Sequence, residues 1–196
     1  MAPDMLSLER ARLWLKLTRS HGIARRYFVV NGFDGALTML GLIMGFRVSG
    51  ASDLGLVLNA CLGAAIALGV SGVSSAYVSE AAERRKALSE LEDAMAKDLG
   101  GSAHGRAAHW VPLLIALVNG AAPLLISLFI LSPLLLVRAG MVLPWSPLLL
   151  ALGCAFFSIF LLGVFLGSVS GQHWLRSGLQ TLLIALITVG LVLLLE

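Results

Sequence analysis

The stretch Tyr27-Phe-Val-Val-Asn-Gly-Phe-Asp-Gly-Ala-Leu-Thr-Met-Leu-Gly-Leu-Ile-Met-Gly-Phe46 decides the fold class of this chain. Its single charged residue is Asp34, and the nearest charges on either side are Arg26 and Arg47. Twenty residues at about 1.5 Å each span roughly 30 Å, which is the thickness of a bilayer's hydrocarbon core. The stretch therefore predicts a membrane-spanning helix that carries a carboxylate about 12 Å inside its first end.

The composition of the whole chain places it in the membrane class. The chain has 196 residues, of which 58% are hydrophobic and 13% charged, whereas soluble domains carry about 25% charged residues. Its two cysteines, Cys61 and Cys154, lie in apolar runs, and we interpret them as packing residues. The basic residues flank apolar segments and form no patch interleaved with aromatics, so we expect no nucleic acid partner.

The order of apolar and charged segments predicts an all-α polytopic protein with five transmembrane helices. Residues 1–24 predict an interfacial amphipathic helix, with a charged face and an apolar face around Trp14. We assign residues 25–79 to transmembrane helices 1 and 2, residues 80–109 to a cytoplasmic acidic helix and linker, and residues 110–196 to transmembrane helices 3 to 5.

The ends of these helices are predicted from local composition. The second span, from Leu54 to about Val78, leads without a break into strong helix formers, so we expect it to continue into water until Gly100. Three prolines in the third span, which starts at Trp110, predict kinks or a break. The fourth span carries glycines at four-residue spacing, which is typical of a small-residue packing face; they are Gly163, Gly167 and Gly171.

The positions of Lys and Arg predict the orientation of the five spans. With five spans, 12 of the 14 basic residues fall on one side of the membrane, while Arg47 and Arg138 fall on the other. Cytoplasmic segments carry the excess of Lys and Arg. We therefore expect a multi-pass protein of the cell membrane with a cytoplasmic amino terminus and an outside carboxyl terminus.

Asp34 is the candidate functional residue of the spans. An ionised carboxylate inside the bilayer costs on the order of 2.5–3.5 kcal/mol, so intramembrane acids favour a functional interpretation over a structural one. Asn31 and Thr38 share its helix face, at i−3 and i+4. In a twofold dimer two Asp34 carboxylates could face each other and couple a metal ion to protons.

A second group of carboxylates follows the second span. Glu80, Glu83 and Glu90 form an acidic stripe, which is either a solvated face or the mouth of a cation path. The two glutamates at i and i+3 would line an inner vestibule facing back toward Ser74 and Ser75. His104 and His109 flank a predicted flexible linker at Gly105, and we interpret them as interfacial residues.

The sequence gives no sign of an enzyme or of a cofactor. It contains no HExxH motif, no nucleophile with a plausible base, and one acid within the membrane, which excludes a two-aspartate intramembrane protease. We therefore expect neither catalytic residues nor a bound cofactor.

Three motifs resemble the vacuolar iron transporter family. Residues 31–45 resemble the family's first transmembrane helix, an Asp-Gly followed by a glycine-rich apolar run. Residues 71–80 resemble the end of its second helix, and Gly120-Ala-Ala-Pro123-Leu-Leu resembles its third. The methionine and the glutamate of the family's second helix are absent between Ser71 and Tyr77, so the resemblance implies a simplified site with oxygen ligands alone.

The resemblance implies a homodimer that exchanges iron or manganese for protons, exporting the metal from the cytoplasm. It places Asp34 in the transport path and implies metal ligands among Asp34, Glu80, Glu83 and Glu90. The alternative is a membrane scaffold or regulator without transport, which docks a partner through an apolar stripe after the second span. That stripe consists of Leu88, Leu91, Met95 and Leu99.

Overall fold

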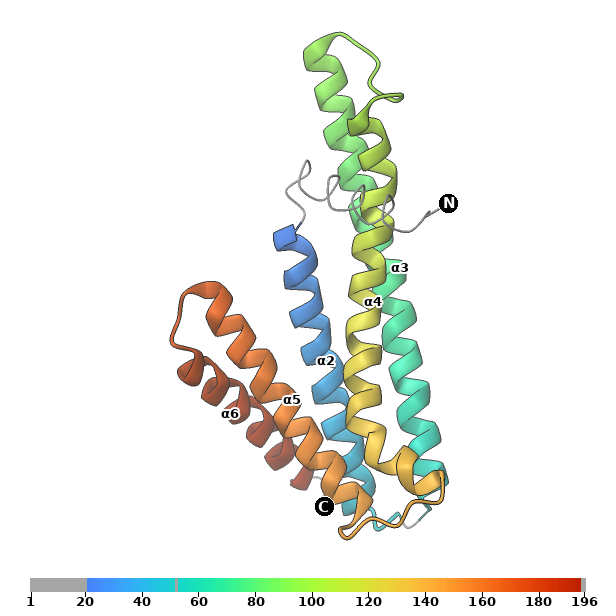
Figure 1. Cartoon of the computed structure of the whole chain (residues 1–196), viewed down its shortest axis with the longest axis vertical. Helices are drawn as coiled ribbons and strands as arrows, with labels where there is room; N and C mark the ends of the chain where they lie inside the picture. The colour runs from blue at the N-terminus through green and yellow to red at the C-terminus, as the bar shows by residue number, and fades with distance from the viewer. Residues whose placement is uncertain (1–20, 52, 195–196) are drawn as a thin grey trace, which may run out of the picture. The chain divides into compact units, whose positions relative to one another are not determined.

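The computed structural model describes residues 21–51 and 53–194, which form helices joined by short turns and contain no strand. The elements in chain order are α2 (His21–Val48), α3 (Leu54–Met95), α4 (Ala103–Arg138), α5 (Pro147–Ser170) and α6 (Trp174–Leu193) (Figure 1). Each of the five is long and apolar enough to cross a membrane. The all-α polytopic class is confirmed, whereas most of the predicted amphipathic helix, residues 1–20, lies outside the described residues.

Helix α3 runs for 42 residues without interruption, so the predicted helical extension of the second span is present. At about 1.5 Å per residue it is roughly twice as long as a bilayer core is thick. It ends at Met95 rather than at Gly100, because Ala96 takes a left-handed conformation with a φ of 44°. The amides of Ala96 and Lys97 donate to the carbonyls of Asp93 (3.3 Å) and Glu92 (3.2 Å), which closes the helix.

Helix α4 begins earlier than predicted, at Ala103 instead of Trp110. The Ser102 hydroxyl accepts the amides of His104 (3.1 Å) and Gly105 (3.2 Å), which is the bonding of a helix amino-terminal cap. The predicted flexible linker at Gly105 is therefore wrong, and His104 and His109 lie in the first turns of the helix.

The sequence predicted kinks or a break in the third span, and the break is wrong, because α4 is continuous through Pro112, Pro123 and Pro133. Each proline removes one backbone donor, but a broken helix in hydrocarbon would expose several backbone groups that no water can bond. The continuous helix is thus the less costly arrangement.

The described chain divides into two compact units. The first unit contains residues 21–28 and 70–121, and the second contains residues 29–69 and 122–194. Helices α2, α3 and α4 contribute residues to both units, whereas α5 and α6 belong to the second. In the first unit Ile23 and Tyr27 of α2 pack against a buried cluster of α4, which consists of Ala107, Val111 and Ile115.

The core of the second unit joins α2 to the other helices through buried aliphatic side chains. Met39, Leu40 and Ile43 of α2 are fully buried in this core. At Gly35 the backbone of α2 touches α4 closely, since a β-carbon there would lie 2.8 Å from the Pro123 Cα. Glycine is needed at this contact because any side chain would meet backbone atoms.

Helices α5 and α6 form an antiparallel pair held by small residues (Figure 1). A β-carbon on Gly163 would overlap the Thr181 side chain, and one on Gly167 would lie 2.6 Å from the Ser177 Cβ. The predicted glycine face of the fourth span therefore packs within the chain. Gly171 does not extend this face, because it ends α5 with a φ of +70°.

Candidate functional site

Asp34 lies on α2 in the second unit, and its side chain is exposed on the surface of the single chain. It forms no hydrogen bond or ion pair with the part of the chain that the structure describes. It stands about 12 Å along the helix from Arg26, at a depth where the bilayer core would surround it. A bare carboxylate at that depth needs water or a covering surface beyond what the described residues provide.

The face of α2 around Asp34 consists of small and polar residues. Asn31 and Thr38 are half-buried at its edges, so the predicted grouping on one side of the helix fits the observed exposure. Further along the same face, β-carbons on Gly41 and Gly45 would meet nothing within 4 Å. The face is therefore open over about three helical turns, wide enough for the backbone of another helix to approach.

Glu80 lies in the first unit and is buried, with 2% of its surface exposed. The Arg84 guanidinium lies 3.5 Å from its carboxylate, and the Tyr27 hydroxyl donates a hydrogen bond to it. Arg26 and Glu83 are near enough to act on it electrostatically. Glu80 thus ties α3 to the start of α2.

These contacts correct the predicted vestibule. Glu80 does not offer a free carboxylate to a vestibule, because it pairs with Arg84. Glu80 does not share an open face with Ser74 and Ser75, since both serines are exposed while the glutamate is buried. Glu80 is buried because Tyr27 of α2 contacts it. A helical wheel of α3 alone does not show contacts with another helix.

The other two carboxylates of the stripe are exposed. Glu83 is free of ion pairs within the described residues, and Glu90 pairs with Lys86 at 3.9 Å. Among residues 21–51 and 53–194, no three His, Cys, Asp or Glu side chains form a group that could hold a metal ion. The exposed carboxylates can therefore attract cations to the end of α3, but the described part of one chain does not assemble them into a cage.

The apolar stripe of the scaffold alternative is largely covered within the chain. Leu99 is buried, Leu88 and Leu91 are half-buried, and Met95 is exposed at 56%. Leu99 is also held by its backbone, since its amide donates to the Glu92 carboxylate at 2.8 Å. A partner could reach this stripe at Met95 but would find most of the remaining side chains partly or wholly covered.

Two polar residues that hold the first unit were not singled out as site residues from the sequence. The Asn119 amide of α4 donates to the Gly72 carbonyl of α3 at 2.7 Å, and it is buried. Tyr27 reaches Glu80 from α2. A signal for Asn119 exists in the sequence, because an uncharged amide in the middle of an apolar span needs a partner.

The two cysteines lie in apolar surroundings, as the sequence indicated. Cys61 is buried in the core of the second unit, Cys154 is half-buried beside it, and both are free thiols. His173 stands in the short turn before α6, at its amino-terminal cap position.

Comparison with known proteins finds a relative of similar length. The chain is 28% identical over 158 residues to the uncharacterized protein MJ0645 of Methanocaldococcus jannaschii, and the match covers 79% of each chain. No protein-family model matches the chain. No solved structure matches it either. The resemblance to the vacuolar iron transporters thus stays a prediction.

Proposed function

We propose that the protein transports a divalent transition metal, iron or manganese, out of the cytoplasm in exchange for protons, and that it works as a homodimer. The substrate is the metal ion, and Asp34 lies in its path with Asn31 and Thr38 beside it. The amino terminus faces the cytoplasm, so metal enters from the end of α3 that carries the exposed glutamates.

The observation that carries the proposal is the exposed Asp34 on a membrane-spanning helix. A carboxylate that has no partner among the described residues and lies within the bilayer is costly unless a second subunit or a water-filled path covers it. The open glycines beyond it allow a second α2 helix to approach. Two facing carboxylates repel each other when both are ionised, and a divalent cation or a shared proton relieves that repulsion.

The exposed carboxylates at the end of α3 have a different role. Glu83 and Glu90 raise the local concentration of cations near the cytoplasmic mouth, because like charges gathered in one region focus the field on counter-ions. Glu80 acts as a tie between helices rather than as a ligand, since its carboxylate is already bonded by Tyr27 and Arg84.

Flux measurements in proteoliposomes test the proposal. With an imposed proton gradient, the wild-type protein is expected to carry Fe²⁺ or Mn²⁺ in the direction opposite to proton flow, and Asp34→Asn is expected to abolish this flux. The matched control is Asp93→Asn, which neutralises an exposed aspartate of α3 outside the apolar part of the helix. Flux that survives Asp34→Asn would remove the aspartate from the mechanism, and absence of flux for every divalent metal would remove the transport function.

A further inference from the structure

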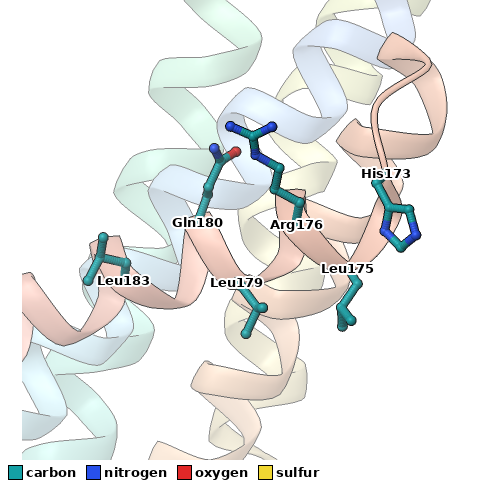
Figure 2. A pocket seen from close by; sticks show the side chains of 6 residues that line it. All are labelled: His173, Leu175, Arg176, Leu179, Gln180 and Leu183. Atoms are coloured by element: carbon teal, nitrogen blue, oxygen red, sulfur yellow. The ribbon is translucent and has the colours of Figure 1, made fainter.

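The exposed face of α6 carries a shallow groove with a volume of about 450 Å³. Figure 2 shows its two rows of side chains, in which Arg176 and Gln180 point to one side of the helix while Leu175 and Leu179 point to the other. His173 lies at the first end of the groove and Leu183 at the second. All six residues belong to the second unit, so the groove is built by one helix and the turn before it.

The polarity of the groove changes in order along the helix axis. His173 and Arg176 lie at the start of α6, next to the interfacial aromatic Trp174. Gln180 follows about 6 Å deeper along the helix, and Leu183 about 10 Å deeper. A phospholipid shows the same order across the interface, with a charged phosphate, then polar ester groups, then acyl chains.

The charge of this region favours an anionic occupant. Arg176 is the one Lys, Arg, Asp or Glu among residues 139–194. Its side chain is exposed and forms no ion pair within the described residues. Guanidinium groups bind phosphate oxygens in a bidentate manner, and a Gln side chain one turn further adds amide donors. The groove thus presents donors and a positive charge with no competing carboxylate.

A leucine row continues beyond the groove on the side of the helix that carries Arg176 and Gln180. Leu183 stands seven residues, about two turns, after Arg176 and so shares its face. Ile187 and Leu191 follow Leu183 at four-residue spacing, and the three are exposed at 59%, 54% and 60%. A second copy of this chain is a poor occupant, because a twofold contact centred on the groove would bring two Arg176 guanidinium groups together. An acyl chain follows the leucine row without that repulsion.

We propose that this groove is a binding site for an anionic phospholipid, with Arg176 and Gln180 holding the headgroup phosphate and its ester region and the leucine row holding an acyl chain. The site is independent of the proposed transport. It binds lipid from whichever leaflet the start of α6 faces.

Trp174 provides a built-in reporter, because the residue is 52% exposed and its ring lies 6.2 Å from the ring of His173, measured between centroids. The test uses a variant that keeps Trp174 and replaces the other three tryptophans with Phe. It is reconstituted in phosphatidylcholine vesicles that contain a small, equal fraction of dibrominated phosphatidylglycerol or dibrominated phosphatidylcholine. Bromine quenches tryptophan fluorescence at contact, so the ratio of the two quenching efficiencies reports lipid selectivity.

We expect the quenching to show that phosphatidylglycerol is enriched about fivefold over phosphatidylcholine next to Trp174. A basic side chain attracts anionic lipid by about 1 kcal/mol, which corresponds to that ratio. Arg176→Gln should return the ratio to about one. The control Arg47→Gln removes an exposed arginine at the end of α2 and should leave the ratio unchanged.

Three results would overturn the assignment. A ratio near one in the unmutated site, or a ratio that Arg176→Gln does not change, shows that the groove does not select anionic lipid. Weak quenching by both lipids shows that protein covers the face. Inorganic phosphate that removes the enrichment at constant ionic strength assigns the groove to free phosphate instead of a lipid.

Discussion

Ala96 holds a backbone conformation that L-residues with a β-carbon adopt at a cost. Its φ of 44° closes α3 in the manner usually given to glycine. Ala96→Gly is therefore expected to raise the free energy of unfolding by roughly 0.5–1 kcal/mol. The measurement is the unfolding midpoint in detergent on titration with a denaturing detergent.

The control for this substitution is Ala94→Gly, two residues earlier within α3. A glycine in the helix interior is expected to cost up to about 1 kcal/mol, so the two changes should have opposite signs. If both substitutions destabilise the protein alike, α3 does not end at Met95 in the membrane-embedded molecule.

Arg84 and Glu80 form an ion pair, and removing one partner alone is expected to destabilise the protein. Arg84→Met leaves the buried Glu80 carboxylate with the Tyr27 hydroxyl as its remaining close donor. A buried acceptor that loses a partner costs about 1–3 kcal/mol, so the variant should melt at a lower temperature. Lys86→Met is the matched control, because Lys86 and Glu90 are 80% and 67% exposed and such pairs contribute little. Equal melting temperatures for both variants would show that Glu80 is solvated.

At the scale of the helices, some glycines lie where two helix backbones touch and others lie where nothing is near. Gly35→Ala places a methyl group 2.8 Å from the Pro123 Cα, so it is expected to destabilise the protein by about 1–3 kcal/mol. Gly41→Ala on the same helix meets nothing within 4 Å and should be neutral or slightly stabilising for the single chain. Thermal unfolding in a detergent that keeps the protein monomeric distinguishes the two. A neutral Gly35→Ala would contradict the close approach of α2 and α4.

The existence of the five helices could be predicted from the sequence, but several of their ends could not. An apolar run as long as residues 27–46 has few alternatives to a membrane-spanning helix, because unpaired backbone groups are so costly in hydrocarbon. The ends of α3 and α4 are set by the conformation of Ala96 and by the Ser102 hydroxyl. Such caps depend on single residues that composition does not distinguish.

The sequence identifies Asp34 as the candidate site residue, but it does not predict which side chains contact Glu80. Asp34 stands out in the sequence because it is the one charge in its span. The burial of Glu80 depends on Tyr27, which lies on another helix more than fifty residues earlier in the chain. Helical periodicity places residues on a face, but it does not tell which faces of different helices meet.

At the scale of the whole molecule, the orientation in the membrane can be tested with single cysteines. In a background without Cys61 and Cys154, Val142→Cys lies between α4 and α5 at a position 97% exposed. It should react with a membrane-impermeant maleimide on intact cells, because the predicted topology puts this turn outside. Glu90→Cys on α3 should react after the cells are opened and not before. The reverse pattern would invert the orientation and the proposed direction of metal flow.

The proposed homodimer makes the last prediction, and it rests on the open face of α2. Gly41→Cys, in the same background, is expected to form a disulfide between two subunits in membranes, because its helix face is small enough for close approach. Gly153→Cys on α5 is the matched control, since a β-carbon there also meets nothing within 4 Å. Crosslinking at Gly153 without crosslinking at Gly41 would move the interface to another helix.

The same crosslink reports on the metal site, because Asp34 lies two helical turns from Gly41 on the shared face. A divalent ion held between two Asp34 carboxylates relieves their repulsion and draws the two α2 helices together. Mn²⁺ is therefore expected to increase the rate of disulfide formation at Gly41→Cys, and Asp34→Asn should remove this increase while leaving the crosslink itself. A crosslink that forms equally fast with and without the metal would keep the dimer and exclude a shared metal ion at Asp34.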